Sequence, residues 1–357
     1  MKMFRRRAEE VLNDPPAPLL PLLLLLSLLY RGGVFLHRWI YDAGLVRRER
    51  LPRPVVSVGN LTVGGGGKTP FIMSLARELL SRGVRPAVLS RGYGRKGQGP
   101  EVVEEEDHWS RYGDEPFLLA KGLKIPVVVS RNRYSAGMKA LEKGNVDLFI
   151  LDDGFQHRAL YRDLDIVVVD GQRRFGKRRL LPAGFLREPV SRLGGADLIV
   201  VTKVSEADPL FEEELRERKD LPVVWADFRP AGLVPRDASG GTGGSQVPPG
   251  PALGFCGIAH PDGFRHSLER AGIDIARFLV FPDHHAFTMQ DVGKITSAAR
   301  EAGVRFMVTT EKDAVRWPGD QQEIPLYCLS MEMIVHEGKE KLMESIESLV
   351  SGRRAAT

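Results

Sequence analysis

Four consecutive glycines followed by lysine and threonine form the pattern with the clearest chemical meaning in this chain. Residues 64–67 precede Lys68 and Thr69, after the apolar run 55–58 and before the apolar-periodic segment 71–80. This strand–loop–helix order is typical of a polyphosphate-binding loop, because glycines let backbone N–H groups curl around phosphates and the helix start adds partial positive charge. Lysine at this position reaches β- and γ-phosphates, and threonine is a ligand of Mg²⁺.

The loop departs from the usual spacing of such a motif. The pattern G-x-x-x-x-G-K-[ST] would place its first glycine at position 62, where this chain has Thr62. A flexible glycine linker is the alternative, but Gly-Lys-Thr at a strand-to-helix junction is hard to explain in that way. We therefore predict a site for a nucleoside triphosphate. The residues expected to contact it are Thr62, Val63, Gly64, Gly65, Gly66, Gly67, Lys68 and Thr69.

A second acidic pattern would complete such a site. The apolar run 148–151 ends in Asp152 and Asp153. A carboxylate after a buried strand is the usual partner of a phosphate loop in holding Mg²⁺. Since side chains alternate along a strand, the two carboxylates point in opposite directions, so that one could hold the metal and the other orient the nucleophile or a neighbouring group. The alternative is a polar strand end that caps the next turn.

Two other clusters are ambiguous when taken alone. Asp114 stands at an expected helix start, and the residues themselves favour an N-cap there. The segment 283–285, Asp-His-His, could be a metal pair, a general-base dyad or a polar surface loop. Adjacent histidines rarely bind one metal together, so we do not expect zinc. The basic loop 90–95 could meet a substrate phosphate or be an exposed turn.

Composition restricts the class of protein. The chain has 357 residues, enough for two domains, with 43% hydrophobic and 27% charged residues, as in a globular protein. A net charge of +5 suits an anionic substrate or an anionic membrane surface. No helix-turn-helix, zinc-finger or aromatic RNA-binding pattern is present, so we expect no nucleic-acid partner. Cys256 and Cys328 lie far apart, which argues against a disulfide framework and for a reducing compartment.

A leucine-rich segment stands near the amino terminus. Residues 19–30 are densely apolar but too short to span a bilayer, which needs about 20 residues. Arginines 5–7 could lead a signal peptide, yet no small-residue cleavage site follows. A buried core helix is a second alternative. We prefer a helix in the membrane interface, with Trp39 at headgroup depth and nearby arginines facing anionic lipid.

The rest of the chain alternates apolar runs with helical segments. This alternation predicts an α/β fold with a doubly wound, mostly parallel sheet whose ligands bind at the carboxyl ends of its strands. We expect an N-terminal membrane-interface segment at 1–48, a phosphate-loop domain at 49–229, a linker at 230–251 and a smaller α/β domain at 252–357. The expected strands are 55–58, 86–90, 125–129, 148–151, 166–170, 198–202, 252–256, 278–281, 306–309 and 326–329; the helices are 71–82, 116–121, 136–143, 263–271, 289–302 and 338–349.

Taken together, these patterns resemble the tetraacyldisaccharide 4′-kinase family, the lipid A 4′-kinases. The resemblance implies that the γ-phosphate of ATP is transferred, with Mg²⁺, to the 4′-hydroxyl of a tetraacylated glucosamine disaccharide 1-phosphate. It also implies a peripheral enzyme on the cytoplasmic face of the inner membrane, with an anionic glycolipid substrate and no obligate protein partner. The motifs that carry it are 59–70, 89–94, 113–116, 152–157, 181–184, 186–189, 255–259, 283–285 and 309–313.

The resemblance also implies roles for single residues. The family's catalytic Asp–His pair falls on Asp114 and His284, which overrides the N-cap interpretation; Asp114 would accept the hydroxyl proton and His284 would hold or tune it. His284 is preferred to His285 from the order within the motif. In the remaining assignments, Mg²⁺ is held by Thr69, Asp152 and Glu188, and the phosphates are bound by Lys68. Arg187 stabilises charge in the transition state, and Asp153 is counted among the catalytic residues.

Two other classes of function stay open at this point. A phosphate-loop GTPase, ATPase switch or metallochaperone is the first, because residues 198–203 resemble a guanine-reading strand end, although no Asp follows two residues after Lys203. A non-enzymatic membrane adaptor is the second, but it leaves the paired carboxylates and Gly-Lys-Thr unexplained.

Overall fold

The computed structural model of the chain describes residue 12 and residues 15–354, apart from 65, 94, 96, 207, 218–220, 237–246 and 320–322. Its strands are β1 (Val55–Gly59), β2 (Pro86–Ser90), β3 (Glu101–Val102), β4 (Val127–Val129), β5 (Leu148–Asp152), β6 (Leu164–Asp170), β7 (Leu198–Thr202), β8 (Val223–Pro235), β9 (Ala252–Cys256), β10 (Ile275–Val280), β11 (Phe306–Thr310) and β12 (Leu326–Glu337). Its helices are α2 (Leu20–Asp42), α3 (Lys68–Ser81), α4 (Asp114–Leu123), α5 (Arg133–Lys143), α6 (Pro209–Arg216), α7 (Pro261–Arg270), α8 (Met289–Glu301), α9 (Glu311–Val315) and α10 (Lys339–Arg354).

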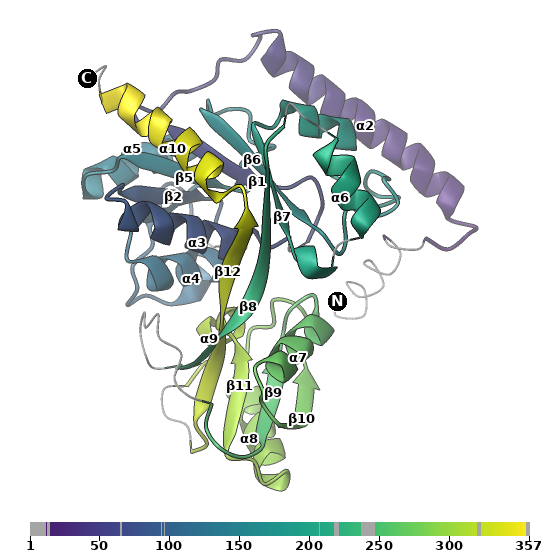
Figure 1. Ribbon diagram of the computed structural model, residues 1–357, viewed down its shortest axis with the longest axis vertical. Helices are drawn as coiled ribbons and strands as arrows, with labels where there is room; N and C mark the ends of the chain where they lie inside the picture. The colour runs from purple at the N-terminus through teal and green to yellow at the C-terminus, as the bar shows by residue number, and fades with distance from the viewer. Residues whose placement is uncertain are drawn as a thin grey trace.

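These strands form one mostly parallel sheet in the order β10-β9-β11-β12-β8-β7-β6-β1-β5-β2-β4-β3. We call β1–β7 and their helices the N-terminal lobe, and β9–β11 with α7, α8 and α9 the C-terminal lobe (Figure 1). In the N-terminal lobe, α3, α4 and α10 cover one face of the sheet, while α5 and α6 cover the other. The doubly wound α/β fold expected from the sequence is confirmed.

The strands of the N-terminal lobe are apolar on both sides because both faces are covered. Every residue of β1, β5 and β7 is buried, which accounts for the unbroken runs of Val, Ile and Leu in the sequence. The carboxyl ends of the parallel strands β1, β5 and β2 therefore lie at one edge of the sheet. That edge carries the phosphate-binding loop and two carboxylates, Asp152 as the last residue of β5 and Asp153 directly after it.

Two long antiparallel strands join the lobes. β8 and β12 pair from Tyr327–Pro235 to Glu337–Trp225, and Figure 1 shows them running from one lobe into the other. The expected linker over 230–251 needs correction at its start, because residues 230–235 belong to β8; residues 237–246 lie outside the described part. Helix α10 also returns to the N-terminal lobe, where Leu342, Met343 and Ile346 join its core.

The N-terminal apolar helix is longer than expected. α2 spans 23 residues, and by length and composition alone it could cross a membrane, with a mean hydropathy of 1.6 over its most apolar window. This finding corrects the statement that the segment is too short to span. The buried-core alternative is also wrong, because Ser27 is the buried residue of α2, and Figure 1 shows the helix along the outside of the N-terminal lobe. Its large exposed side chains include Leu22, Leu25, Leu28, Leu29, Phe35, Leu36 and Trp39.

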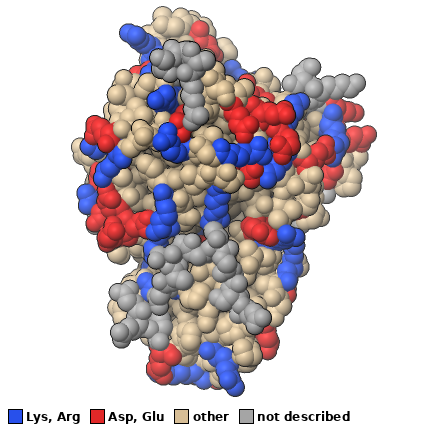
Figure 2. Space-filling model, turned by 60° about the vertical axis from the view of Figure 1, so that its left-hand side comes forward, with Lys and Arg blue, Asp and Glu red and all other residues tan. Residues whose placement is uncertain are grey.

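Charge is distributed rather than concentrated on the face shown in Figure 2. Acidic and basic side chains alternate there, with red and blue groups next to one another. The small positive net charge of the chain therefore does not form a broad basic surface on this side.

Candidate active site

The phosphate-binding loop lies between β1 and α3. Gly67 is the N-cap of α3, with φ +82°, a conformation that favours glycine. A Cβ atom there would lie 2.9 Å from Cε2 of Phe228, so a larger residue would also clash with β8. Lys68 and Thr69 form the first turn of the helix, and Thr69 is buried. Gly65 lies outside the described residues.

The beginning of the loop is held by a neighbouring segment. Thr62 forms an isolated bridge with Leu186, and the backbone N–H of Val63 donates to the carbonyl of Phe185 at 2.8 Å. Thr202 at the end of β7 donates its hydroxyl to the carbonyl of Gly66 at 3.3 Å. These contacts fix both ends of the loop, so that little conformational entropy is lost when a phosphate binds.

Lys68 and Arg187 meet at Asp153. Nζ of Lys68 donates to Oδ1 of Asn60 at 2.9 Å and lies 3.3 Å from Oδ1 of Asp153. Nη1 of Arg187 donates to both oxygens of Asp153, at 3.0 and 2.8 Å. Burial alone would raise the pKa of Asp153, but the two cations outweigh burial and lower this pKa. Asp153 thus holds two cations beside the loop where a triphosphate would place its negative charge.

Asp152 occupies a different environment, as strand alternation predicts. Its Oδ2 accepts a hydrogen bond from Oγ of Ser90 at 2.8 Å, and its carboxylate is buried. Burial, and then the nearby charges of Glu115 and Asp153, raises the pKa of Asp152 to about 6. Such a crowded group of carboxylates gains stability from a cation.

Mg²⁺ fits this group of donors. The buried hydroxyl of Thr69 and the carboxylate of Asp152 offer the hard oxygens that Mg²⁺ binds, and kinases complete its shell with phosphate oxygens and water. Within the described part of the chain, no cluster of three or more His, Cys, Asp and Glu has the arrangement of a metal site.

Glu188 has another partner. Its Oε2 accepts from Nε of Arg192 at 3.2 Å, and its side chain is buried. One of its two carboxylate oxygens is therefore already engaged by a guanidinium. A role as a Mg²⁺ ligand would use the other oxygen or require the ion pair to open, and it stays a prediction.

Asp114 and His284 come together from different lobes. Gly113, at φ +98°, turns the chain into α4, and Oδ1 of Asp114 accepts the N–H of Glu115 at 3.0 Å. Its Oδ2 lies 2.8 Å from Nδ1 of His284. Burial would raise the pKa of Asp114, but His284, and then Arg316 and Lys312, lower it to about 2. The hydrogen bond to Asp114 raises the pKa of His284.

The segment 309–313 and the nearby Arg316 lie beside the Asp114–His284 pair. Periodicity in the sequence assigns this segment no role. Lys312 forms an ion pair with Glu115, beside Asp114 in sequence. Asp313 and Arg316 form a buried pair, with Nη2 to Oδ1 at 2.8 Å and side-chain exposures of 0% and 1%. Nε of Arg316 also lies 3.7 Å from Asp114. Short helix α9 thus links the lobes at the site.

His285 serves another purpose. Its Nε2 lies 3.0 Å from Oδ2 of Asp291, and its ring stacks on Phe281. Asp291 and Thr288 form the capping box at the start of α8. His285 therefore supports the fold of the C-terminal lobe, while His284 faces Asp114.

Two further residues near the loop were not singled out from the sequence. Nη2 of Arg173 lies 3.2 Å from Nδ1 of His260, and Nη1 of Arg173 would lie 3.3 Å from a Cβ on Gly64. They join the phosphate loop to the start of α7. Neither belongs to a spacing pattern, so no sequence signal marked them.

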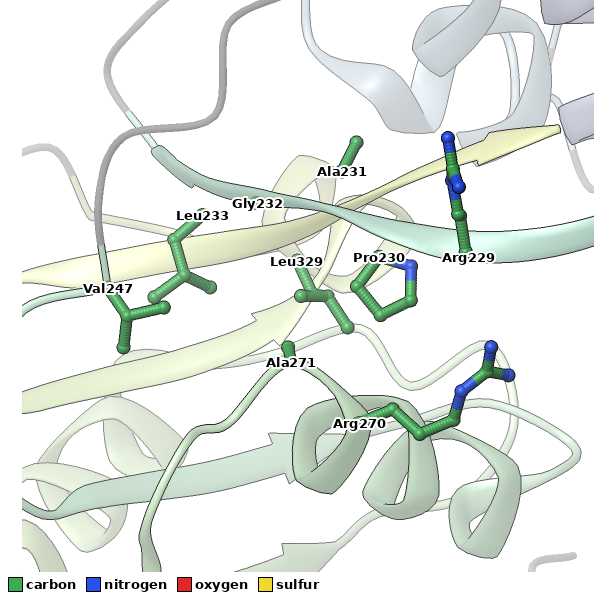
Figure 3. A pocket seen from close by; sticks show the side chains of 9 residues that line it. All are labelled: Arg229, Pro230, Ala231, Gly232, Leu233, Val247, Arg270, Ala271 and Leu329. Atoms are coloured by element: carbon green, nitrogen blue, oxygen red, sulfur yellow. The ribbon is translucent and has the colours of Figure 1, made fainter. Parts of the chain in front are cut away.

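Two cavities lie away from these side chains. One of about 400 Å³ lies beside β8 and the end of α7, lined by Arg229, Leu233 and Arg270 among others (Figure 3). Another of about 460 Å³ lies between α3, α4 and the β8–β12 pair. Neither is lined by Lys68, Asp114 or His284. The site is therefore assigned from its side chains rather than from the cavities.

Comparison with known proteins decides the family. Residues 19–351 match the family described as tetraacyldisaccharide-1-P 4′-kinase, LpxK. The chain belongs to this family. Members similar to it include the tetraacyldisaccharide 4′-kinase of Syntrophus aciditrophicus, 38% identical over 369 residues that cover 97% of each chain. That of Syntrophobacter fumaroxidans is 41% identical over 352 residues, covering 95% of this chain and 90% of the relative.

A solved structure of the family has the same fold. The crystal structure of the "apo" form of LpxK from Aquifex aeolicus in complex with ATP superimposes with a TM-score of 0.75 at 34% identity, covering 94% of this chain and 99% of that one. The resemblance inferred from the motifs is thereby confirmed, and the GTPase-switch and adaptor alternatives lose their support.

Proposed function

We propose that this chain transfers the γ-phosphate of ATP to the 4′-hydroxyl of a tetraacylated disaccharide 1-phosphate. The observation that carries the proposal is the position of Lys68 and Arg187, which both reach Asp153 beside a phosphate-binding loop in a member of this kinase family. Phosphoryl transfer depends on positioning and on charge stabilisation. The ammonium of Lys68 and the guanidinium of Arg187 would supply both to the γ-phosphate.

The Asp114–His284 pair receives the proton of the attacking hydroxyl in this proposal. Because the pKa of Asp114 is lowered to about 2, its carboxylate is ionised at neutral pH and is an acceptor only. Nδ1 of His284 then carries the hydrogen of their 2.8 Å contact. A proton taken up by the pair is shared with the imidazole, whose raised pKa favours the protonated form.

A bound Mg²⁺ would supply positive charge that offsets the negative charge of the phosphates. Thr69 and Asp152 would hold it. Lys68 would bind the β- and γ-phosphates, and Arg187 would stabilise charge as the phosphoryl group leaves. The backbone of residues 62–67 would bind the rest of the triphosphate through its N–H groups.

We also propose that the enzyme is peripheral and lies on the cytoplasmic face of the inner membrane, where ATP is available. Exposed leucines on α2, together with Trp39 and Phe35, support contact with lipid. Replacing Leu25 and Leu28 by Glu should release the full chain from vesicles of phosphatidylethanolamine and phosphatidylglycerol. Leu210→Glu, at an exposed leucine on α6, is the control. Unchanged flotation of the α2 variant would contradict the proposal.

The kinase proposal has a direct test. Purified chain is incubated with Mg²⁺, the disaccharide 1-phosphate lipid and ATP labelled at the γ-phosphate, with labelled GTP in parallel. Label is expected in the lipid at the 4′ position, from ATP. Nucleotide hydrolysis with no labelled lipid would instead support a switch protein.

A further inference from the structure

Helix α2 lies against the rest of the molecule along one face, on which Ser27 is buried and Leu23, Tyr30 and Val34 are partly buried. Most of its large apolar residues are exposed, whereas Ser27 is only 8% exposed and Tyr30 is partly buried. These two residues lie three positions apart and therefore share one face of the helix. A serine and a tyrosine thus face the N-terminal lobe between the partly buried Leu23 and Val34.

Both side chains bind the segment 180–187. Oγ of Ser27 donates to the carbonyl of Leu180 at 2.9 Å and accepts the N–H of Ala183 at 3.2 Å. The hydroxyl of Tyr30 donates to the carbonyl of Arg187 at 3.1 Å. Each hydrogen bond joins residues more than 150 positions apart in sequence. The helix therefore holds this segment at both of its ends.

The other side of the same segment is attached to the phosphate-binding loop. The N–H of Arg187 donates to the carbonyl of Leu61 at 2.7 Å, and Phe185 accepts from Val63. The backbone of Arg187 is thus fixed through its N–H by Leu61, just after β1, and through its carbonyl by α2. Its guanidinium, in turn, binds Asp153. Tyr30 consequently forms a hydrogen bond with the backbone of Arg187, a member of the Lys68–Asp153–Arg187 group.

We propose that Tyr30, assisted by Ser27, is a positioning residue that sets where the Arg187 guanidinium lies, so that the lipid-facing helix forms part of the active site. This inference rests on the proposed function and on the proposed role of Arg187. Because the apolar face of α2 has no protein partner in the described chain, lipid seats the helix from outside while Ser27 and Tyr30 transmit that position inward.

The first experiment compares Tyr30→Phe with Tyr41→Phe in the full chain. Tyr41 lies on the same helix but contacts the ring of His37. Loss of one hydrogen bond to the Arg187 carbonyl should lower kcat about three- to tenfold. KM for ATP should stay the same, because Lys68 and the loop are untouched. Tyr41→Phe should retain the kcat of the unaltered chain, and both variants should float with vesicles as it does.

A double-mutant cycle separates positioning from a general loss of structure. If Tyr30 acts through Arg187, Tyr30→Phe should have no further effect on kcat in an Arg187→Ala background. Ser27→Ala should likewise have no further effect on kcat in the Arg187→Ala background, with its Tm measured to account for the hydrogen bond lost at the partly buried Leu180 carbonyl. Effects that add in the cycle would overturn the inference, as would full kcat in Tyr30→Phe.

The two levels of the proposal fail in different ways. If the unaltered chain labels no lipid, the proposed function itself is wrong. If it labels lipid and Arg187→Ala is fully active, the role of Arg187 is wrong and the inference fails with it. If Arg187→Ala is impaired but Tyr30→Phe is not, only the inference fails.

Discussion

Nδ1 of His284 lies 2.8 Å from Oδ2 of Asp114, although 170 positions separate the two residues in sequence. Asp114 begins a helix of the N-terminal lobe, and His284 lies in a loop of the C-terminal lobe. In the proposed mechanism, where this pair receives the proton of the substrate, the proton acceptor is complete only when the lobes are in contact. The proposed chemistry would then be coupled to the relative position of the lobes, as in enzymes that close before they react.

Adjacent histidines should respond differently to the same substitution. His284→Gln removes the ionisable partner of Asp114 and should lower kcat about 10²-fold, as loss of a positioned acid–base group does. His285→Gln disturbs the contact with Asp291 that supports the cap of α8, and it should lower the free energy of unfolding by about 1 kcal/mol. Steady-state kinetics and urea unfolding of both variants test this.

The test compares the kcat and the stability of the two variants. His285→Gln should keep most of its kcat once the protein is folded, and His284→Gln should keep its stability to within about 1 kcal/mol. The reverse pattern would assign the chemistry to His285.

The dependence of kcat/KM on pH should report the protonation of the Asp114–His284 pair. Activity needs a free acceptor, so kcat/KM should rise with pH as the pair loses its proton. The pKa of His284 is raised by Asp114, so the midpoint should lie above the ordinary histidine value of about 6.5. In His284→Gln the limb above the ordinary histidine value should disappear, because the imidazole is gone while Arg316 and Lys312 still lower the pKa of the Asp114 carboxyl. A limb that persists in the variant would locate the titrating group elsewhere.

Lys68→Ala should abolish most of the activity. It removes an ammonium group that lies within 3.3 Å of Asp153 at the start of α3, and loss of a preorganised donor costs about 10²- to 10³-fold in kcat. Lys139→Ala is the matched control, since Lys139 is exposed on α5 and forms its ion pair there with Glu142. Retention of lipid phosphorylation by Lys68→Ala would argue decisively against the site.

Arg316→Met should destabilise the C-terminal lobe. The side chain is 1% exposed and pairs with Asp313, which is fully buried, so its removal leaves a buried carboxylate without its cation. Breaking such a pair costs about 3–5 kcal/mol. Arg300→Met, at an exposed ion pair with Glu323, should change the free energy of unfolding by less than about 1 kcal/mol. Urea denaturation measures both, and equal effects would contradict the prediction.

The sequence predicts the parts of the fold that depend on local pattern. The bounds of β2, β7 and β9 match the expected ranges, because continuous apolar runs flanked by polar residues define buried strands locally. β8 was missed. Its Pro230 and Gly232 are typical of a linker, but beyond Trp225 the strand pairs only with β12 among the described strands, and an edge tolerates proline.

The residues of the site, like the strands, could be predicted only where a local sequence pattern marks them. Lys68 and Asp152 follow from local strand–loop–helix patterns. Asp114 did not: its residues alone favoured an N-cap, and only the family resemblance paired it with His284. The contacts of Tyr30 with Arg187 and of Arg316 with Asp114 depend on segments that are distant in sequence. Spacing along the chain contains no signal for such contacts.

The return of α10 to the N-terminal lobe affects the order of events during synthesis. Domains generally fold as units while the chain emerges, amino terminus first. Here Leu342, Met343 and Ile346 fill the core that α3 and β1 begin, so the first lobe made by the ribosome is completed by the last helix. Until α10 emerges, the nascent chain exposes the part of this apolar core that Leu342, Met343 and Ile346 will cover.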